Sequence, residues 1–247
     1  MLAEAGFIAA EDEARELRAG AAGDEALLDE LVARRLTGEP LAWITGRTEF
    51  CGIDVRVDPG VYVPRPHTEL LAERAAALLP EAGVAIDLCT GSGAIAKVLA
   101  GRRPGARVFA TDVDERAIAC ARANGVDARR GDLFAPLPPI TADVVTAVVP
   151  YVPDGELGLL QRDTFTFESA LPYGGGPDGA DVLRRVVREA AGFLDGTLLL
   201  ELGAGQPELL RDEMSRLGYR DVRTLLDEDG DVRGVEAVHL RDAGSPP

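Results

Sequence analysis

The chain has 247 residues, of which 46% are hydrophobic and 28% are charged, a composition typical of a globular protein and not of a disordered one. Its 42 acidic and 26 basic side chains give a net charge of −16. Because so acidic a surface repels phosphate groups, we expect no nucleic-acid partner. No apolar run approaches the roughly 18 residues that cross a bilayer, and no signal peptide is recognisable, so we expect no membrane partner and a cytoplasmic location.

Cysteine and histidine usage argues against a metal centre or a disulfide. Cys51, Cys89 and Cys120 form no close pair, and His67 and His239 are the only histidines. Neither set has the spacing of a zinc site, and three scattered cysteines suit reduced, buried thiols. We therefore expect no metal.

The first 64 residues predict two helices and a hairpin. Residues 11–17 form a weak, highly charged helix candidate, and residues 27–36 carry apolar side chains at helical spacing before Gly38 ends the run. Between residues 48 and 64, alternating apolar side chains flank Asp58-Pro59-Gly60. This pattern predicts a β-hairpin that turns at the Pro-Gly pair.

From Thr68 onward, helical and extended patterns alternate along the chain. Such alternation predicts an α/β fold with a parallel sheet that is covered on both faces. Asp178-Gly179 predicts the start of the last of these helices. The predicted strands are 84–88, 108–111, 144–149 and 198–202, the predicted helices are 68–79, 94–100, 115–124 and 179–193, and two further strands flank Asp229-Gly230.

The most informative segment is 84–96, where an apolar strand leads through a glycine-rich turn into a helix. Gly91 and Gly93 let the backbone approach a ligand closely, and the following helix offers free N–H groups. The same turn holds Cys89 and Thr90. This arrangement suits two cofactors, a nicotinamide dinucleotide or S-adenosylmethionine.

Three carboxylates favour S-adenosylmethionine. Asp112 ends the next strand, about 20 residues after the glycines, where a carboxylate accepts hydrogen bonds from both ribose hydroxyls. Asp87 lies four residues before Gly91, where it would repel a pyrophosphate but attract an ammonium and a sulfonium. Asp132 lies between the predicted strands 108–111 and 144–149 and suits an adenine amino group, with Phe134 as an apolar wall.

Several motifs in the same order resemble the HemK-type protein-(glutamine-N5) methyltransferases, whose known members methylate a glutamine of release factors or of a ribosomal protein. The resemblance covers residues 34–202. It implies a class I, Rossmann-like, seven-stranded methyltransferase sheet at 67–247, after a small helical domain at 1–46 and a β-hairpin linker at 47–66. The matching stretches are 38–46, 49–52, 63–69, 87–93, 131–134, Glu168 and 175–179.

The resemblance also implies the roles of individual residues. The expected cofactor is S-adenosylmethionine, and the expected partner is a protein substrate similar to a release factor. The acceptor motif is expected to hold the catalytic residues Val149, Pro150 and Tyr151. Residues expected to bind the cofactor are Asp87, Cys89, Thr90, Gly91, Gly93, Asp112, Val113, Asp132, Leu133 and Val148, and those expected to bind the substrate are Arg65, Glu69, Val148 and Tyr151.

The chain departs from the family at its acceptor motif. The family has Asn-Pro-Pro-Tyr there, and this chain has Val148-Val149-Pro150-Tyr151. The family's asparagine grips an amide hydrogen of the substrate, and Val148 has no polar side-chain atom with which to do so. Two alternatives therefore stay open: methylation of a small molecule at N, O or C, and cofactor binding without turnover. In addition, His67 replaces an acidic residue and the helical region before Gly38 is shorter than in the family.

The segment around Arg65 is expected to complete the pocket. Pro64 and Pro66 stiffen the chain on both sides of Arg65. We expect this segment and the hairpin to form a wall between the helical region and the cofactor domain. Arg65 and Glu69 should then lie at the mouth of the pocket.

Overall fold

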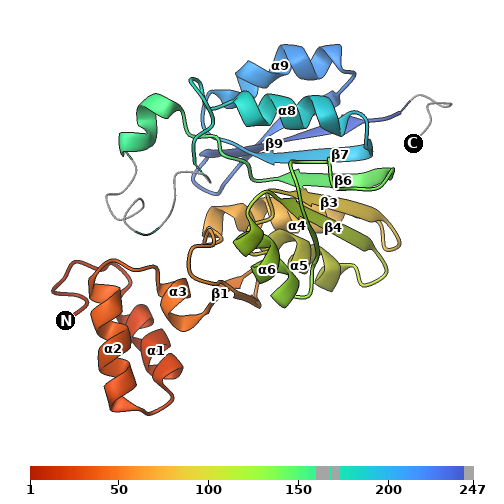
Figure 1. Cartoon of the computed structure of the whole chain (residues 1–247). Coiled ribbons are helices and arrows are strands. Elements are labelled where there is room, and N and C mark those ends of the chain that lie inside the picture. Colours follow the sequence, from red (N-terminus) through yellow and green to blue (C-terminus); the bar gives the residue numbers. More distant parts are fainter. Residues whose placement is uncertain (160–166, 168–172, 242–247) are drawn as a thin grey trace.

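The computed structural model describes residues 1–159, 167 and 173–241, and it shows a small helical unit joined through a hairpin to a larger α/β unit (Figure 1). The helical unit consists of α1 (Ala10–Ala21), α2 (Glu25–Leu36) and α3 (Leu41–Thr45). Its own core is formed by apolar side chains of all three helices. Asp24 caps α2 by accepting a hydrogen bond from the Leu27 amide at 3.1 Å, which satisfies one of the free N–H groups of the first turn.

The hairpin turns seven residues earlier than the sequence predicts. Strands β1 (Arg47–Phe50) and β2 (Ile53–Arg56) pair antiparallel around Cys51 and Gly52, which both have positive φ angles. The prediction that the hairpin turns at Asp58-Pro59-Gly60 is therefore wrong, although these residues do form a tight turn, in which the Val61 amide donates to the Asp58 carbonyl at 3.1 Å. The valines around it do not pair with one another, because Val55, Val57 and Val61 are buried against the first helices of the α/β unit.

The larger unit contains a seven-stranded sheet with the strand order β5-β4-β3-β6-β7-β9-β8. The first five strands are parallel, and β9 pairs antiparallel with both β7 and β8. This is the expected α/β, Rossmann-like architecture. The strands are β3 (Val84–Leu88), β4 (Arg107–Asp112), β5 (Asp127–Arg130), β6 (Ala142–Ala147), β7 (Leu194–Glu201), β8 (Arg220–Leu226) and β9 (Val232–His239).

Helices cover both faces of the sheet, as Figure 1 shows. One face packs against α4 (Glu69–Leu78), α5 (Ala94–Arg102) and α6 (Glu115–Ala123), and the other packs against α8 (Asp181–Ala190) and α9 (Gln206–Arg216). Burial on both sides explains why the central strands are continuous apolar runs. Two short 3₁₀ helices, η1 (Pro66–Thr68) and η2 (Asp154–Leu159), lie in the connections.

The sequence predicts the central strands and most helices, and among the α-helices and strands of the described residues it misses three. Strand β5 has the sequence Asp-Ala-Arg-Arg, which resembles a loop, and it lies at the edge of the sheet. Helix α9 follows two glycines and contains a proline near its start, and its outer face is strongly polar. The five-residue helix α3 is too short to produce a periodic pattern.

Polar contacts hold the hairpin segment against the α/β unit. Asn124 donates from Nδ2 to the carbonyls of Arg56 at 2.9 Å and Ser92 at 2.8 Å, and its Oδ1 accepts from the Arg56 amide. Trp43 donates from its indole nitrogen to the Val61 carbonyl at 2.8 Å. These bonds keep the segment after the hairpin beside the glycine-rich turn.

None of the helices in the described part of the chain is long and apolar enough to cross a membrane.

Candidate cofactor and acceptor site

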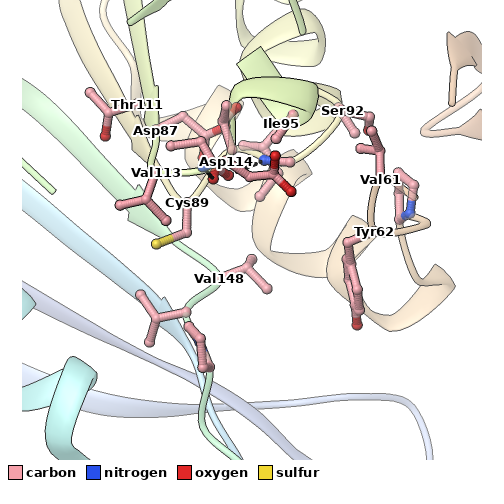
Figure 2. A pocket seen from close by; sticks show the side chains of 18 of the residues that line it. Val61, Tyr62, Asp87, Cys89, Ser92, Ile95, Thr111, Val113, Asp114 and Val148 are labelled. Carbon is pink, nitrogen blue, oxygen red and sulfur yellow. Dashed lines mark hydrogen bonds between the residues drawn. The ribbon is translucent and has the colours of Figure 1, made fainter. Parts of the chain in front are cut away.

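A cavity of about 680 Å³ lies at the carboxyl ends of β3, β4, β5 and β6 (Figure 2). Its volume is within the range of pockets that enclose a small molecule, about 300–1,000 Å³. The carboxyl edge of a parallel sheet is the usual ligand site of such folds, because the loops that follow the strands meet there. The segment 60–68 and helix α8 close the cavity from two other sides.

Asp87 lies at the base of the cavity, with 1% of its surface exposed. Its carboxylate accepts hydrogen bonds from the hydroxyls of Thr90 at 2.5 Å and Thr146 at 2.8 Å. Burial raises the pKa of Asp87 to about 6, although both hydroxyls oppose this rise. A buried carboxylate without a cationic partner is costly. The site is therefore suited to a ligand that carries a positive charge.

Asp112 and Gly91 form the wall of the cavity beside Asp87. The Asp112 carboxylate accepts from the amides of Gly91 at 3.0 Å and Asp114 at 2.9 Å. Burial raises the pKa of Asp112. Gly91 has a φ of +56°, and a side chain there would meet no protein atom within 4 Å. The backbone thus borders open space at the position where the sequence predicts close approach to a ligand.

The third carboxylate has a partner that the sequence did not predict. Asp132 lines the cavity, and its carboxylate forms an ion pair with the Arg185 guanidinium of α8 at 2.8 Å. Leu133 and Val113 line the same end of the cavity, where they provide apolar contact. Thr111 also borders this cavity, and its hydroxyl is fully buried without a hydrogen-bond partner among the described residues.

These features fit S-adenosylmethionine. Asp87 suits the cation of its amino-acid end, Asp112 suits the ribose hydroxyls, and Asp132 suits the adenine amino group. The two deeper carboxylates make the cavity unsuitable for a pyrophosphate, which they would repel. When bound, S-adenosylmethionine supplies a methyl group on a positively charged sulfur.

The predicted acceptor motif lies against the same cavity. Val148, Val149, Pro150 and Tyr151 all line it, and the Val148 side chain projects into the open space between Cys89 and Tyr62 (Figure 2). The Val149 side chain packs into the core of the sheet with 2% exposure. The cavity therefore receives an aliphatic side chain from Val148 at the position where the family has an asparagine.

Tyr151 is held through its hydroxyl. It donates to the buried Glu201 carboxylate at 3.1 Å, and that carboxylate also accepts from the Thr68 hydroxyl at 2.6 Å. The His67 Nε2 atom lies 3.3 Å from Glu201. Burial and the neighbouring Glu201 raise the pKa of the Tyr151 phenol well above its ordinary value. The phenol therefore stays protonated and remains a donor.

Arg65 lies at the wall of the cavity, as predicted from its flanking prolines. It donates to the hydroxyls of Tyr62 at 3.3 Å and Tyr173 at 3.1 Å. The two tyrosine rings meet edge to face, with their centroids 5.7 Å apart. Tyr62 and Tyr173 were missed by sequence reasoning, because isolated tyrosines in loops carry no periodic signal.

Three sequence predictions of position are corrected. Gly93 does not line the cavity: it has a φ of +81°, and a side chain there would come within 3.0 Å of the Ala121 Cβ atom, so its role is tight packing at the start of α5. Glu69 begins α4 and is not among the lining residues. Phe134 is buried and stacks on Phe193 at 4.6 Å in the core, not beside the cavity. Glu168 lies outside the described residues.

We expect Asp112→Ala to weaken S-adenosylmethionine binding by about 1–3 kcal/mol, because charged hydrogen bonds to the ribose are lost. The corresponding change in Kd is roughly 5- to 150-fold, which titration calorimetry measures. Asp127→Ala is a matched control, since Asp127 is exposed on β5, is paired with the Arg129 side chain and is not among the residues that line the cavity. Equal losses in the two variants would contradict a ribose contact at Asp112.

Comparison with known protein families supports a methyltransferase. Residues 53–145 match the family model "Methyltransferase small domain". The release factor glutamine methyltransferase of Geobacter sulfurreducens is 38% identical over 213 residues, which cover 83% of this chain and 75% of that protein. The Neisseria gonorrhoeae protein of the same name is 38% identical over 222 residues, which cover 86% and 80% of the two chains.

Solved structures show the same fold. The ribosomal protein L11 methylase from Lactobacillus delbrueckii subsp. bulgaricus superposes with a TM-score of 0.56 at 16% identity, over 76% of this chain and 86% of that one. The Thermus thermophilus 16S rRNA N2 G1207 methyltransferase, in complex with AdoMet and guanosine, has a TM-score of 0.55 at 21% identity, over 81% of this chain and 46% of that one. At these identities the likeness concerns the fold.

Proposed function

The chain belongs to the release factor glutamine methyltransferase family, and we propose that it transfers a methyl group from S-adenosylmethionine to a side-chain amide nitrogen of a protein related to release factors. It is an S-adenosylmethionine-dependent methyltransferase. The observation that supports the acceptor is the continuity of the cavity, because Asp87, Asp112 and the segment Val148–Tyr151 border one space. An acidic surface is consistent with a protein partner and unfavourable for a nucleic acid.

The residues of the chain act by binding and orientation. Asp87 and Asp112 hold the cofactor at its two polar regions, and the apolar side chain of Val148 excludes water from the space beside it. The acceptor segment presents its backbone carbonyls and the Tyr151 side chain to the substrate. Holding both reactants in line is the main catalytic contribution in such a transfer, because orientation removes most of the entropic barrier.

The acceptor class is tested with a labelled methyl group on S-adenosylmethionine. One arm offers full-length release factors and a peptide that contains the target glutamine, and the second arm offers a small-molecule extract. We expect label in the protein arm, with the methyl group on a glutamine amide in peptide mass spectra. Label in the small-molecule arm alone would favour the small-molecule alternative, which Val148 supports by making the wall apolar. Cofactor binding without label in either arm would indicate loss of turnover.

We expect Val148→Asn to increase methylation of a release-factor peptide about 10- to 100-fold. The physical reason is that an amide hydrogen pressed against valine loses its water without gaining an acceptor, which costs about 1–3 kcal/mol. Val148→Thr is a control of nearly the same size, and its hydroxyl has a different geometry. If the unaltered protein already methylates the peptide rapidly and Val148→Asn adds nothing, the substitution has no influence on the acceptor.

A further inference from the structure

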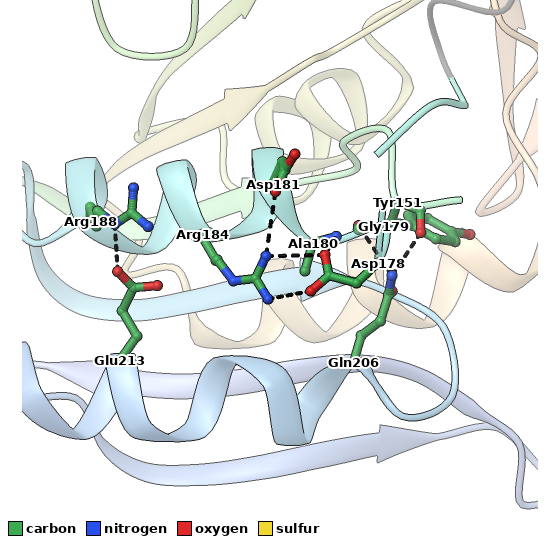
Figure 3. A network of polar contacts seen from close by, with 9 residues as sticks. All are labelled: Tyr151, Asp178, Gly179, Ala180, Asp181, Arg184, Arg188, Gln206 and Glu213. Carbon is green, nitrogen blue, oxygen red and sulfur yellow. Dashed lines mark hydrogen bonds and ion pairs between the residues drawn. The ribbon is translucent and has the colours of Figure 1, made fainter. Parts of the chain in front are cut away.

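The acceptor segment is held from behind by a residue that does not line the cavity. Gln206, at the start of α9, is 5% exposed. Its side-chain nitrogen donates to the Tyr151 carbonyl at 2.7 Å and to the Gly179 carbonyl at 3.1 Å (Figure 3). Its side-chain oxygen accepts from the Gly203 amide at 2.7 Å. One buried amide thus joins three backbone segments.

The backbone at Gly179 lies so close to the Tyr151 carbonyl that no side chain fits at position 179. Gly179 has a φ of +74°, and a Cβ atom there would lie 2.2 Å from the Tyr151 carbonyl oxygen and 2.6 Å from the Gln206 side-chain nitrogen. Only glycine allows these two backbone segments to approach so closely. The amide of Gly179 donates to Gly176, so a tight turn delivers this glycine to the contact.

Further hydrogen bonds and an ion pair fix the backbone next to the two carbonyls that Gln206 contacts, those of Tyr151 and Gly179. The Val152 amide donates to the Tyr173 carbonyl at 2.9 Å, and the Val152 carbonyl accepts from the Gly175 amide at 2.9 Å. Asp178 pairs with Arg184 of α8 and accepts from the Ala180 amide at 3.0 Å (Figure 3). The acceptor segment is therefore attached to the start of α8, and Gln206 is the side chain that links both to the end of β7.

We propose that Gln206 is a positioning residue, which sets the direction of the acceptor-segment carbonyls toward the substrate. The proposal rests on the proposed function. In this chain Val148 contributes no side-chain hydrogen bond, so the orientation of the acceptor amide depends on the backbone of residues 149–151. That backbone is held at Tyr151 by the Gln206 amide. A displacement of about 1 Å in such an element lowers transfer about 100-fold.

Two substitutions separate the donor half of Gln206 from its acceptor half. Gln206→Glu keeps an oxygen for the Gly203 amide and removes both donors, and Gln206→Met removes all three bonds at similar length. We expect both to lower kcat for methyl transfer about 10- to 100-fold while the Kd for S-adenosylmethionine changes less than 3-fold. Glu213→Gln is the control, because Glu213 lies on the same helix, is partly buried and pairs with Arg188 of α8.

A second measurement does not depend on activity. Hydrogen–deuterium exchange of the peptide that contains Val152 should be at least 10-fold faster in both Gln206 variants than in Glu213→Gln, while peptides of β3 and β4 stay unchanged. Unchanged exchange at Val152 would overturn the proposal whatever the enzyme's acceptor is. The absence of methyl transfer in the unaltered protein would instead contradict the proposed function and leave the exchange result to decide the role of Gln206.

Combination with Val148→Asn distinguishes positioning from general support of the fold. An asparagine at position 148 supplies its own grip on the acceptor, so the loss of kcat caused by Gln206→Glu should become several-fold smaller in that background. Equal losses in the two backgrounds, together with weaker cofactor binding, would show a merely structural role and overturn the proposal.

Discussion

The Asp87→Asn variant should bind S-adenosylmethionine roughly 100-fold more weakly than the unaltered protein. The Asp87 carboxylate is buried and has two hydroxyl partners but no cationic side chain among them, so the positive end of the cofactor is its natural counter-ion. Removing one partner of a buried ion pair costs about 3–5 kcal/mol, which corresponds to about 100-fold or more in Kd. Titration calorimetry at pH 7.5 measures this loss.

The pH dependence of cofactor binding tests the same carboxylate. Burial raises the pKa of Asp87 to about 6 in the cofactor-free protein. Below that pH the carboxyl group is neutral and no longer attracts a cation. We therefore expect cofactor affinity to rise as the pH increases through about 6 in the unaltered protein, and this step to be absent in Asp87→Asn. The same step in both variants would show that another group controls binding.

The free energy of unfolding should change in the opposite direction. Between the ordinary pKa of 3.8 and the value of about 6, the folded state binds more protons at Asp87 than the unfolded state. The contribution of Asp87 to stability therefore falls as the pH rises through this window, by up to about 3 kcal/mol, and is constant above it. Since other carboxyl groups titrate as well, the measurement is the difference between the two variants in denaturant unfolding. Asp87→Asn should gain stability relative to the unaltered protein at pH 7 and not at pH 4.

Local patterns predicted which of the residues 84–112 the structure brings together at the carboxyl edge of the sheet. The strand, glycine turn and helix of residues 84–96 form a continuous stretch, so their geometry follows from neighbouring residues. Asp112 ends the next strand, and parallel strands bring their carboxyl ends to one edge of the sheet. Asp87, Gly91 and Asp112 could therefore be placed together before the structure was known.

The acceptor side could not be predicted in the same way, because it is assembled from distant segments. Tyr151 meets Glu201 and Gln206 across about 50 residues of sequence. Glu201 did carry a signal, since a charged residue at the end of an otherwise apolar strand needs buried partners. Gln206 carried none, because it follows two glycines and precedes a proline in a segment that resembles a loop.

The hairpin shows how a strong local signal was outweighed by tertiary packing. Asp58-Pro59-Gly60 has the residues of a turn, and the valines around it alternate as in strands. In the structure, Val57 and Val61 do not pair as strands but pack in one apolar cluster with side chains of α4 and α5. The turn of the hairpin falls at Cys51-Gly52, where a non-glycine residue accepts a positive φ.

We expect Glu201→Leu to lower the free energy of unfolding by about 2–3 kcal/mol. Three groups from two segments meet at this carboxylate: the hydroxyls of Thr68 in η1 and of Tyr151 donate to it, and the Nε2 atom of His67, also in η1, lies 3.3 Å away. Leucine fills the same space but leaves buried donors without an acceptor, and each such group costs about 1–3 kcal/mol. Denaturant unfolding measures the loss.

Comparison of Glu201→Leu with Glu201→Gln and Glu208→Gln shows whether the loss of stability comes from donors left without an acceptor. Glutamine keeps one acceptor oxygen, so its effect should be smaller than that of leucine. Glu208 is exposed on α9 and lies 3.8 Å from Arg211, so its substitution should change stability by less than about 0.5 kcal/mol. If Glu201→Leu were as stable as Glu208→Gln, the buried carboxylate would not be holding the donors.

The Tyr151 hydroxyl is one of the donors to Glu201. We therefore also expect Glu201→Leu to slow methyl transfer. The Kd for S-adenosylmethionine should change little, since Asp87 and Asp112 lie on other strands.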